Sequence, residues 1–342
     1  MLLYLHIPFC DSKCHYCAFN SFTSNHHLKK RYIQALCKQL RHDLEHTDTR
    51  WLHSLYIGGG TPSTIDPRLY EPIFKLLVPL ITPHTEITME ANPNSAKAEW
   101  LQGVKALGVN RISFGVQSFD DTKLSFLGRA HSAREAIQAI ENAARVGFER
   151  INIDLIYDTA LDTKELLRSD IQLAINLPID HISTYALILE EGTPFANKRE
   201  YKKDDEDLGY FIKDLIPFEH YEVSNFGQTP SRHNLGYWRL EEYLGVGCGA
   251  VGYKDGQRSY PPQDLKTYLQ NPLKKEIELL SPHDLRLEKI FLGLRSCVGV
   301  PKSLVDPQKA QILLEEHRLY ERGERLYNPN YFLADELALF LS

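Results

Sequence analysis

Residues 1–190 alternate short β-rich runs with amphipathic helical stretches, and this alternation constrains the fold more than any other feature of the chain. Strands that alternate with helices form parallel sheets with right-handed crossovers. A complete eight-unit barrel typically needs about 250 residues, so six units predict an open, partial (β/α)6 barrel of the α/β class. The predicted strands are Leu2–Pro8, Ser54–Ile57, Glu86–Glu90, Arg111–Val116, Asn152–Tyr157 and His181–Leu189.

Helical patterns fill the intervals between these strands. The first has an apolar stripe that includes Leu28, Leu36 and Leu44, and the isolated Cys37 lies on it as a core residue. The other helical patterns cover Leu69–Leu80, Ala96–Leu107, Ala133–Val146 and Lys164–Asn176.

The pattern changes after Gly192-Thr193-Pro194, and we expect three units. Residues 1–195 would form the partial barrel, and residues 196–275 would extend it with additional mixed strands. Residues 276–342 would form a small helical C-terminal domain, for which a winged helix is one candidate.

Three of the six cysteines, Cys10, Cys14 and Cys17, lie in one short loop. A secreted disulfide scaffold would spread its cysteines in pairs, so a tight cluster indicates metal binding in a reducing compartment. The first ten residues lack a positive n-region and a cleavage site, and no later run approaches about 20 apolar residues. We therefore expect a cytoplasmic protein without a transmembrane segment. The net charge of -6, without a lysine or arginine block, argues against a nucleic-acid partner.

The spacing Cys10-x3-Cys14-x2-Cys17 predicts a 4Fe-4S cluster. Three thiolates are one ligand short for a cubane with four irons, so the fourth iron keeps a position that a small chelator can occupy. The amino-carboxylate of S-adenosylmethionine suits this position, and an electron from the cluster can then cleave the adjacent carbon–sulfur bond to give a 5′-deoxyadenosyl radical. The alternative is a zinc site that adds one histidine, from His15, His26 or His27. Zinc sites normally use C-x2-C pairs, which favours the cluster.

The segment from Tyr4-x-His6-Ile-Pro-Phe-Cys10 to Cys17-Ala-Phe19 resembles the radical-SAM branch that contains the oxygen-independent coproporphyrinogen oxidases and the HemW-type heme chaperones. The resemblance extends across most of the chain. It implies the cluster, S-adenosylmethionine, and an electron donor such as flavodoxin or ferredoxin.

Polar residues follow the ends of the predicted strands, where barrels of parallel strands build their sites. A zwitterionic ligand with a ribose needs an arginine for its carboxylate and acceptors for its amino group and hydroxyls. Singly, each such residue is more often a surface ion pair or a structural hydrogen bonder. By resemblance, Gly59, Gly60 and Thr61 would contact S-adenosylmethionine, and Tyr4 would lie near it. Glu90 would accept from its amino group, and Arg129 would pair with its carboxylate. Gln117 and Asp154 would contact its ribose. Asp158–Asp162 replaces the Gly-Leu-Pro-Gly loop that is usual in the family, so the resemblance does not predict the shape of this loop.

Two features favour the chaperones over the oxidases. Phe19 stands where the oxidases carry a further cysteine, and we expect the protein to lack their longer N-terminal segment. The resemblance therefore implies a protein without coproporphyrinogen oxidase activity.

The segment His233-Asn234-Leu235-Gly236-Tyr237-Trp238, within 196–275, is similar to the HNxxYW element associated with heme binding in the chaperones. Imidazole is a common heme ligand, and tyrosine and tryptophan can pack on a porphyrin face. The alternative is a polar turn with two core aromatics. Val251 stands where a histidine is common in the family, and the nearby Cys248 is a second candidate ligand or a buried structural thiol.

The leading hypothesis is a chaperone that binds heme and transfers it to an unknown acceptor protein. The second is a radical-SAM oxidoreductase that acts on coproporphyrinogen or another tetrapyrrole, and a structural zinc protein comes third.

Overall fold

The computed structural model describes residues 1–342 and confirms the open, partial barrel. Six strands pair in parallel in the order of the chain, and each lies within a few residues of its predicted position. They are β1 (Leu2–Ile7), β2 (Ser54–Gly59), β3 (Glu86–Ala91), β4 (Arg111–Gln117), β5 (Arg150–Tyr157) and β6 (His181–Ala186).

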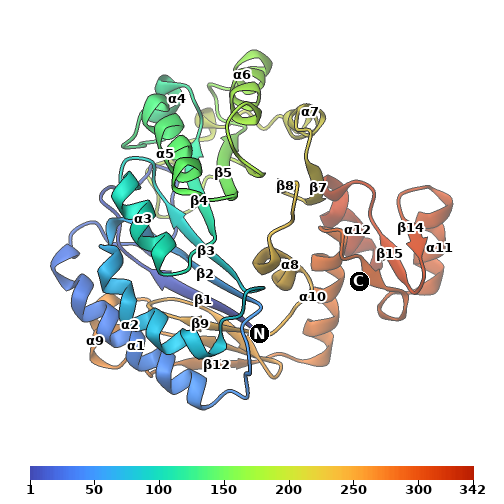
Figure 1. Cartoon of the computed structure of the whole chain (residues 1–342). Helices are drawn as coiled ribbons and strands as arrows, with labels where there is room; N and C mark the ends of the chain where they lie inside the picture. The colour runs from blue at the N-terminus through green and yellow to red at the C-terminus, as the bar shows by residue number, and fades with distance from the viewer.

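Helices cover the outer face of this curved sheet (Figure 1). Five correspond to the predicted helices, and the short α4 was not predicted. The helices are α1 (Lys29–Glu45), α2 (Pro67–Leu77), α3 (Ala98–Ala106), α4 (Asp121–Phe126), α5 (Ala133–Val146) and α6 (Lys164–Ile175). Their apolar stripes and the outward side of the strands form one core of 50 buried residues. The inner side of the strands is left for polar residues.

Additional strands extend the sheet at both ends to a total of twelve. Beside β1 lies the parallel β9, followed by three antiparallel strands, and β8 and β7 lie beside β6. The two outermost strands do not pair with each other, so the barrel stays open. The added strands are β7 (Glu219–Glu222), β8 (Asn225–Gly227), β9 (Tyr243–Val246), β10 (Gly252–Lys254), β11 (Gln257–Tyr260) and β12 (Glu276–Leu279). Between them lie α7 (Asp207–Leu215), α8 (Arg232–Trp238) and α9 (Leu265–Gln270).

The C-terminal elements form a separate group in the cartoon (Figure 1). This region has its own core of 12 buried residues. Three helices surround a small antiparallel sheet in the order β13-β15-β14. The elements are α10 (Pro282–Leu294), β13 (Val300–Pro301), α11 (Pro307–Glu315), β14 (Tyr320–Arg322), β15 (Arg325–Tyr327) and α12 (Ala334–Leu341). The domain boundaries and the winged-helix interpretation stay predictions. None of the helices combines the length and hydrophobicity that a bilayer span requires.

Candidate functional site

A cavity of about 350 Å³ begins at the carboxyl ends of the parallel strands and reaches into the barrel interior. Its lining includes the three predicted cluster cysteines and seven of the eight residues predicted to bind S-adenosylmethionine. These are Cys10, Cys14, Cys17, Gly59, Gly60, Thr61, Glu90, Gln117, Arg129 and Asp154. The structure therefore gathers residues that are distant in the sequence around one space.

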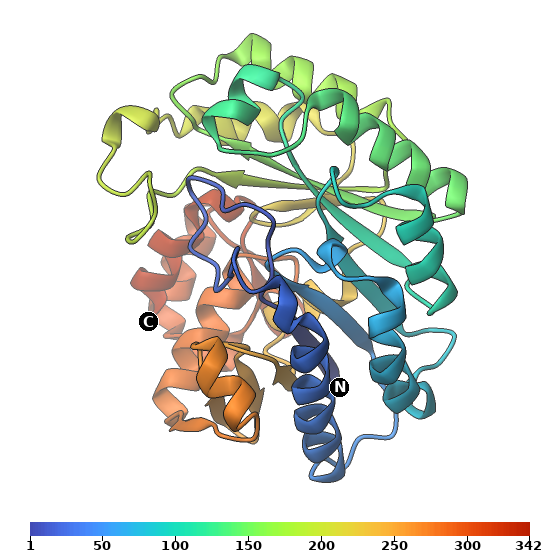
Figure 2. The ribbon, with the colours of Figure 1, turned by 90° about the vertical axis from the view of Figure 1, so that its left-hand side faces the viewer.

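The cysteine loop follows β1 directly and is dark blue in Figure 2. Its backbone is tied to the rest of the barrel, because His15 N donates to Leu127 O at 3.0 Å. Cys10 Sγ accepts a hydrogen bond from Thr61 Oγ1 at 3.3 Å, and Cys14 Sγ accepts one from Arg129 Nη1 at 3.1 Å. Burial raises the pKa of the Cys10 and Cys17 thiols, so a bound cation is needed to hold them as thiolates at neutral pH.

The three thiols line one cavity, and the choice between a cluster and zinc stays a prediction. No three histidine, cysteine or acidic side chains lie close enough to share one metal ion. A tetrahedral zinc with Zn–S bonds of about 2.3 Å would bring its thiolates within roughly 4 Å of one another. In a cubane each thiolate binds a different iron, so the sulfurs lie farther apart. His15, one of the proposed zinc ligands, has its Nδ1 2.9 Å from Phe126 O.

Glu90 is held by two donors at the end of β3. Tyr56 donates its hydroxyl hydrogen to Oε1 at 2.8 Å, and Gly59 N donates to Oε2 at 3.0 Å. Burial raises the pKa of Glu90 to about 7, and the charge of Asp154 adds to this rise. A Cβ atom at Gly58 would lie 2.8 Å from Glu90 Cδ, so only glycine leaves room for this carboxyl.

Arg129 is a buried guanidinium without a carboxylate partner. Its Nη2 donates to Asn92 Oδ1 at 2.9 Å and to Gly115 O at 2.6 Å, while Nε has no partner. The groups that hold its pKa high are Tyr16 and Cys14, not an acid. The side chain can therefore accept a carboxylate from a ligand.

Gln117 and Asp154 complete the lining from β4 and β5. A register shift between Gly115 and Gln117 interrupts the pairing of β4, and Gln117 has a φ of 71°. Non-glycine residues held in this left-handed region are strained and occur often at functional sites. Asp154 Oδ1 accepts from Asn152 Nδ2 at 2.8 Å, and burial raises its pKa. Tyr4 lies outside the lining, where its hydroxyl is 2.9 Å from His6 Nδ1.

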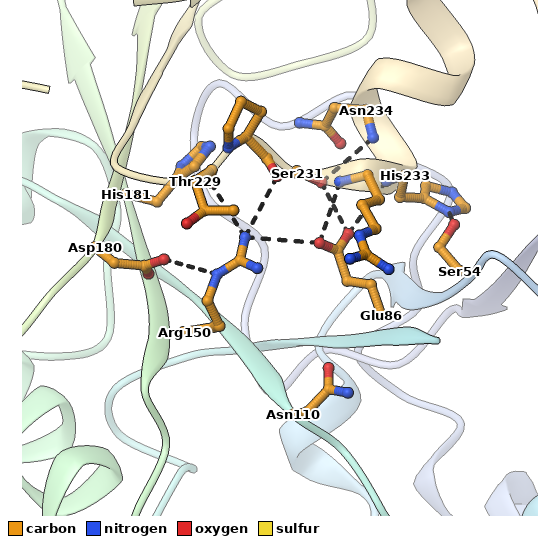
Figure 3. Close-up of polar contacts among 12 residues, drawn as sticks. Ser54, Glu86, Asn110, Arg150, Asp180, His181, Thr229, Ser231, His233 and Asn234 are labelled. Carbon is orange, nitrogen blue, oxygen red and sulfur yellow. Dashed lines mark hydrogen bonds and ion pairs between the residues drawn. The ribbon is translucent and has the colours of Figure 1, made fainter. Parts of the chain in front are cut away.

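The α8 helix, which carries the HNxxYW element, is fixed to the barrel by Glu86 of β3 (Figure 3). This buried carboxylate accepts hydrogen bonds from Ser231 Oγ at 3.2 Å and from the backbone N of Arg232 and of His233, each at 3.1 Å. Arg150 lies between Glu86 and Asp180, with contacts of 3.7 and 2.7 Å. The start of α8 is therefore held in one position.

Both ring nitrogens of His233 are engaged inside the protein. Nδ1 lies 2.7 Å from Ser54 Oγ (Figure 3), and Nε2 lies 2.9 Å from Tyr237 OH. Burial lowers the pKa of His233 to about 3, so the imidazole is neutral. His233, Tyr237 and the half-buried Trp238 do not line the cavity, whereas Asn234 does. The heme assignment of the three residues stays a prediction.

The rim loop and Cys248 are both held by contacts inside the protein. In the rim loop, Asp162 forms a fully buried ion pair with Lys123 of α4 at 2.5 Å and accepts from Thr159 N at 2.7 Å. Cys248 is also buried, with its Sγ 3.1 Å from Gln263 O. Burial raises the pKa of this thiol to about 12, which is the behaviour of a structural thiol.

Sequence reasoning missed several residues of the lining, notably Tyr56, Asn92, Arg111, Asn152 and Tyr185. Four of the five lie on the strands themselves. Two of the five, Asn92 and Asn152, are each two residues from a predicted position, Glu90 and Asp154. The period-two alternation of a strand places such neighbours on the same face, and this signal could have found them.

Comparisons with known proteins show which family and fold the chain resembles. Residues 4–169 match the model of the Radical SAM superfamily. The heme chaperone HemW of Bacillus subtilis (strain 168) is 33% identical, over 87% of this chain and 84% of that protein. The heme chaperone HemW of Lactococcus lactis subsp. lactis (strain IL1403) is 35% identical, over 99% of this chain and 92% of that protein. Coproporphyrinogen III oxidase from Escherichia coli superposes with a TM-score of 0.82 at 21% identity, over 99% of this chain and 89% of that one, which establishes a shared fold.

Proposed function

We propose a heme-carrying function for this chain, starting from the premise that it belongs to the HemW family of heme chaperones within the radical SAM superfamily. In this proposal the protein binds heme and transfers it to an acceptor protein, and it holds a 4Fe-4S cluster and S-adenosylmethionine. The observation that carries the heme assignment is similarity to proteins named heme chaperone over 99% of the chain. The six free cysteines agree with a reducing cytoplasm.

The cavity supports the two other cofactors. Cys10, Cys14 and Cys17 would hold three irons of the cluster and leave the fourth for an amino-carboxylate chelator. When bound, the cluster would supply the electron that cleaves S-adenosylmethionine, with a flavodoxin or a ferredoxin as the candidate donor. The loop around the thiols would exclude water and hold their sulfurs in place.

The remaining side chains would orient S-adenosylmethionine by charge. Arg129, which lacks an acidic partner in the protein, would pair with the ligand's carboxylate. Glu90, already aligned by Tyr56 and Gly59, would accept from its amino group. Asp154 would accept from the ribose hydroxyls.

In this proposal heme binds beside α8. His233 can coordinate iron through Nε2 only if its contact with Tyr237 is broken, because that nitrogen is engaged at 2.9 Å. We therefore infer that heme binding displaces either Tyr237 or the imidazole ring of His233. A protein in which α8 stayed rigid would need another axial ligand.

A second candidate is a radical-SAM oxidoreductase that acts on coproporphyrinogen or another tetrapyrrole. One observation favours it: the cavity contains a complete set of charged and polar groups for S-adenosylmethionine, which heme carriage by itself does not require. Phe19, in place of a further cysteine, argues against this candidate.

The two candidates are separated by one experiment on anaerobically reconstituted protein. We expect a Soret band that saturates as heme is added, and no consumption of coproporphyrinogen III in the presence of S-adenosylmethionine and a reductant. The matched pair Cys17→Ser and Cys37→Ser should differ in cluster content, which shows whether heme uptake depends on the cluster. Turnover of coproporphyrinogen III, or the absence of a heme-dependent Soret band, would overturn the chaperone assignment.

A further inference from the structure

Arg111 is a buried arginine without a partner. It begins β4, is 2% exposed, and lines the cavity on its inner side. Its side chain forms no ion pair and no hydrogen bond, and Nε is buried without an acceptor. Buried guanidinium groups are normally paired, because an unpaired one loses its hydration without compensation.

Thr88 lies directly beside Arg111 on the neighbouring strand. The two residues are register partners in the pairing of β3 with β4. Thr88 is fully buried, and its hydroxyl oxygen also has no hydrogen-bond partner. Adjacent strands are about 4.8 Å apart, so the two unpaired groups are neighbours. Arg111 lines the cavity and Thr88 does not, so only the guanidinium is open to a ligand.

The charges of the cavity leave Arg111 without a counterpart even when S-adenosylmethionine is bound. That ligand has a single carboxylate, which the proposed function assigns to Arg129. Its amino group and ribose are assigned to Glu90 and Asp154. Neither acid forms an ion pair with Arg111. Burial raises the pKa of both acids, and the charge of Arg111 opposes this rise only in part.

We propose that Arg111, with Thr88 beside it, forms a subsite for a carboxylate group of a second ligand, deeper in the barrel than S-adenosylmethionine. Arginine binds carboxylates with two parallel hydrogen bonds. Asn234 of α8 lines the same cavity as Arg111, so this cavity reaches the HNxxYW element. The inference rests on the proposed function for the assignment of the remaining charges.

The carboxylate can come from two sources, a propionate side chain of heme or a free small carboxylate. The competing explanation is that Arg111 serves only as a distant counter-charge for Glu90 and Asp154. In that case its replacement would change the affinity for S-adenosylmethionine and would not affect the binding of any carboxylate.

The test uses reconstituted protein saturated with S-adenosylmethionine, and the variants Arg111→Gln and Thr88→Val. The surface variant Arg68→Gln is the matched control, because Arg68 pairs only with Asp66 at the protein surface. Calorimetry with sodium propionate measures the free carboxylate. Soret titrations that compare heme with heme dimethyl ester, which lacks free propionates, measure the side-chain carboxylate.

We expect Arg111→Gln to weaken the binding of the carboxylate by about tenfold or more, as loss of a charged hydrogen-bond partner does, and Thr88→Val to weaken it less. If the wild type binds propionate and Arg111→Gln does not, the ligand is a free carboxylate. If the wild type binds heme more tightly than its ester and Arg111→Gln loses this preference, the ligand is a heme propionate. If neither ligand responds to Arg111→Gln or Thr88→Val, the inference is wrong. Equal binding of heme and its ester, with no propionate binding, overturns the subsite and leaves the chaperone assignment standing. Should Arg111→Gln fail to fold, Arg111→Lys decides, because lysine keeps the charge but cannot form the two parallel hydrogen bonds.

Discussion

Replacement of Lys123 by methionine should lower the free energy of unfolding by about 3–5 kcal/mol, the usual cost of removing one partner from a buried ion pair. Lys123 and Asp162 are both fully buried, and Lys123 Nζ also donates to Ile156 O at 2.7 Å. Methionine nearly fills the same volume, so the cost arises from charge and not from a cavity. Asp162 would keep only its two hydrogen bonds from Thr159.

The same change should loosen the cysteine loop, because Lys123 anchors α4. The carbonyl of Phe126, the last residue of α4, and that of Leu127 contact His15, at the centre of the loop. We therefore expect Lys123→Met to retain less iron after anaerobic reconstitution than the wild-type protein does.

Urea unfolding of the metal-free protein measures the first effect through the midpoint at constant slope. The double variant Lys123→Met/Asp162→Asn should be less destabilised than Lys123→Met alone, since no buried charge then lacks its partner. The control Arg145→Ala removes an exposed ion pair with Glu141 and should cost less than about 0.5 kcal/mol. A loss below about 1 kcal/mol for Lys123→Met, or a double variant with strictly additive losses, would refute the reasoning.

Three further predictions concern other parts of the chain. Burial raises the pKa of Glu222 to about 7, above the value of about 4.5 in the unfolded chain. The free energy of unfolding therefore falls as pH rises between these two values, by about 3 kcal/mol in total. Glu222→Gln should therefore show a smaller drop in Tm between pH 5 and pH 8 than the wild type, and an unchanged drop would contradict the prediction. Cys17→Ser should lose the cluster while Cys37→Ser keeps it, as measured by iron content; equal iron in both would exclude Cys17 as a ligand. His233→Ala should weaken heme uptake and spare the cluster, and an unaltered heme titration would remove His233 from the heme site.

The sequence predicted the features that depend on local pattern. The six parallel strands follow from their alternation with helices, and the cysteine spacing indicated the cluster loop before any contact was known. The short α4 was missed because six residues are too few for an apolar stripe to emerge.

Features that depend on register or distant pairing could not be read from the chain. Glu86 was predicted only as the start of a strand, yet it caps a helix 147 residues later. Ser54 meets His233 across 179 positions, and this contact, which occupies the imidazole, has no local signature. Arg111 looked like an ordinary strand residue until its alignment with Thr88 showed two unpaired polar groups side by side.

The central claim is that three thiolates hold a cluster whose fourth iron is open to S-adenosylmethionine. Electron paramagnetic resonance of the anaerobically reconstituted, reduced protein, recorded with and without S-adenosylmethionine, tests this most directly. We predict about four irons per chain and a signal that changes when S-adenosylmethionine is added. A signal indifferent to S-adenosylmethionine, or a purified protein that holds tetrahedral zinc and no iron, would contradict the account.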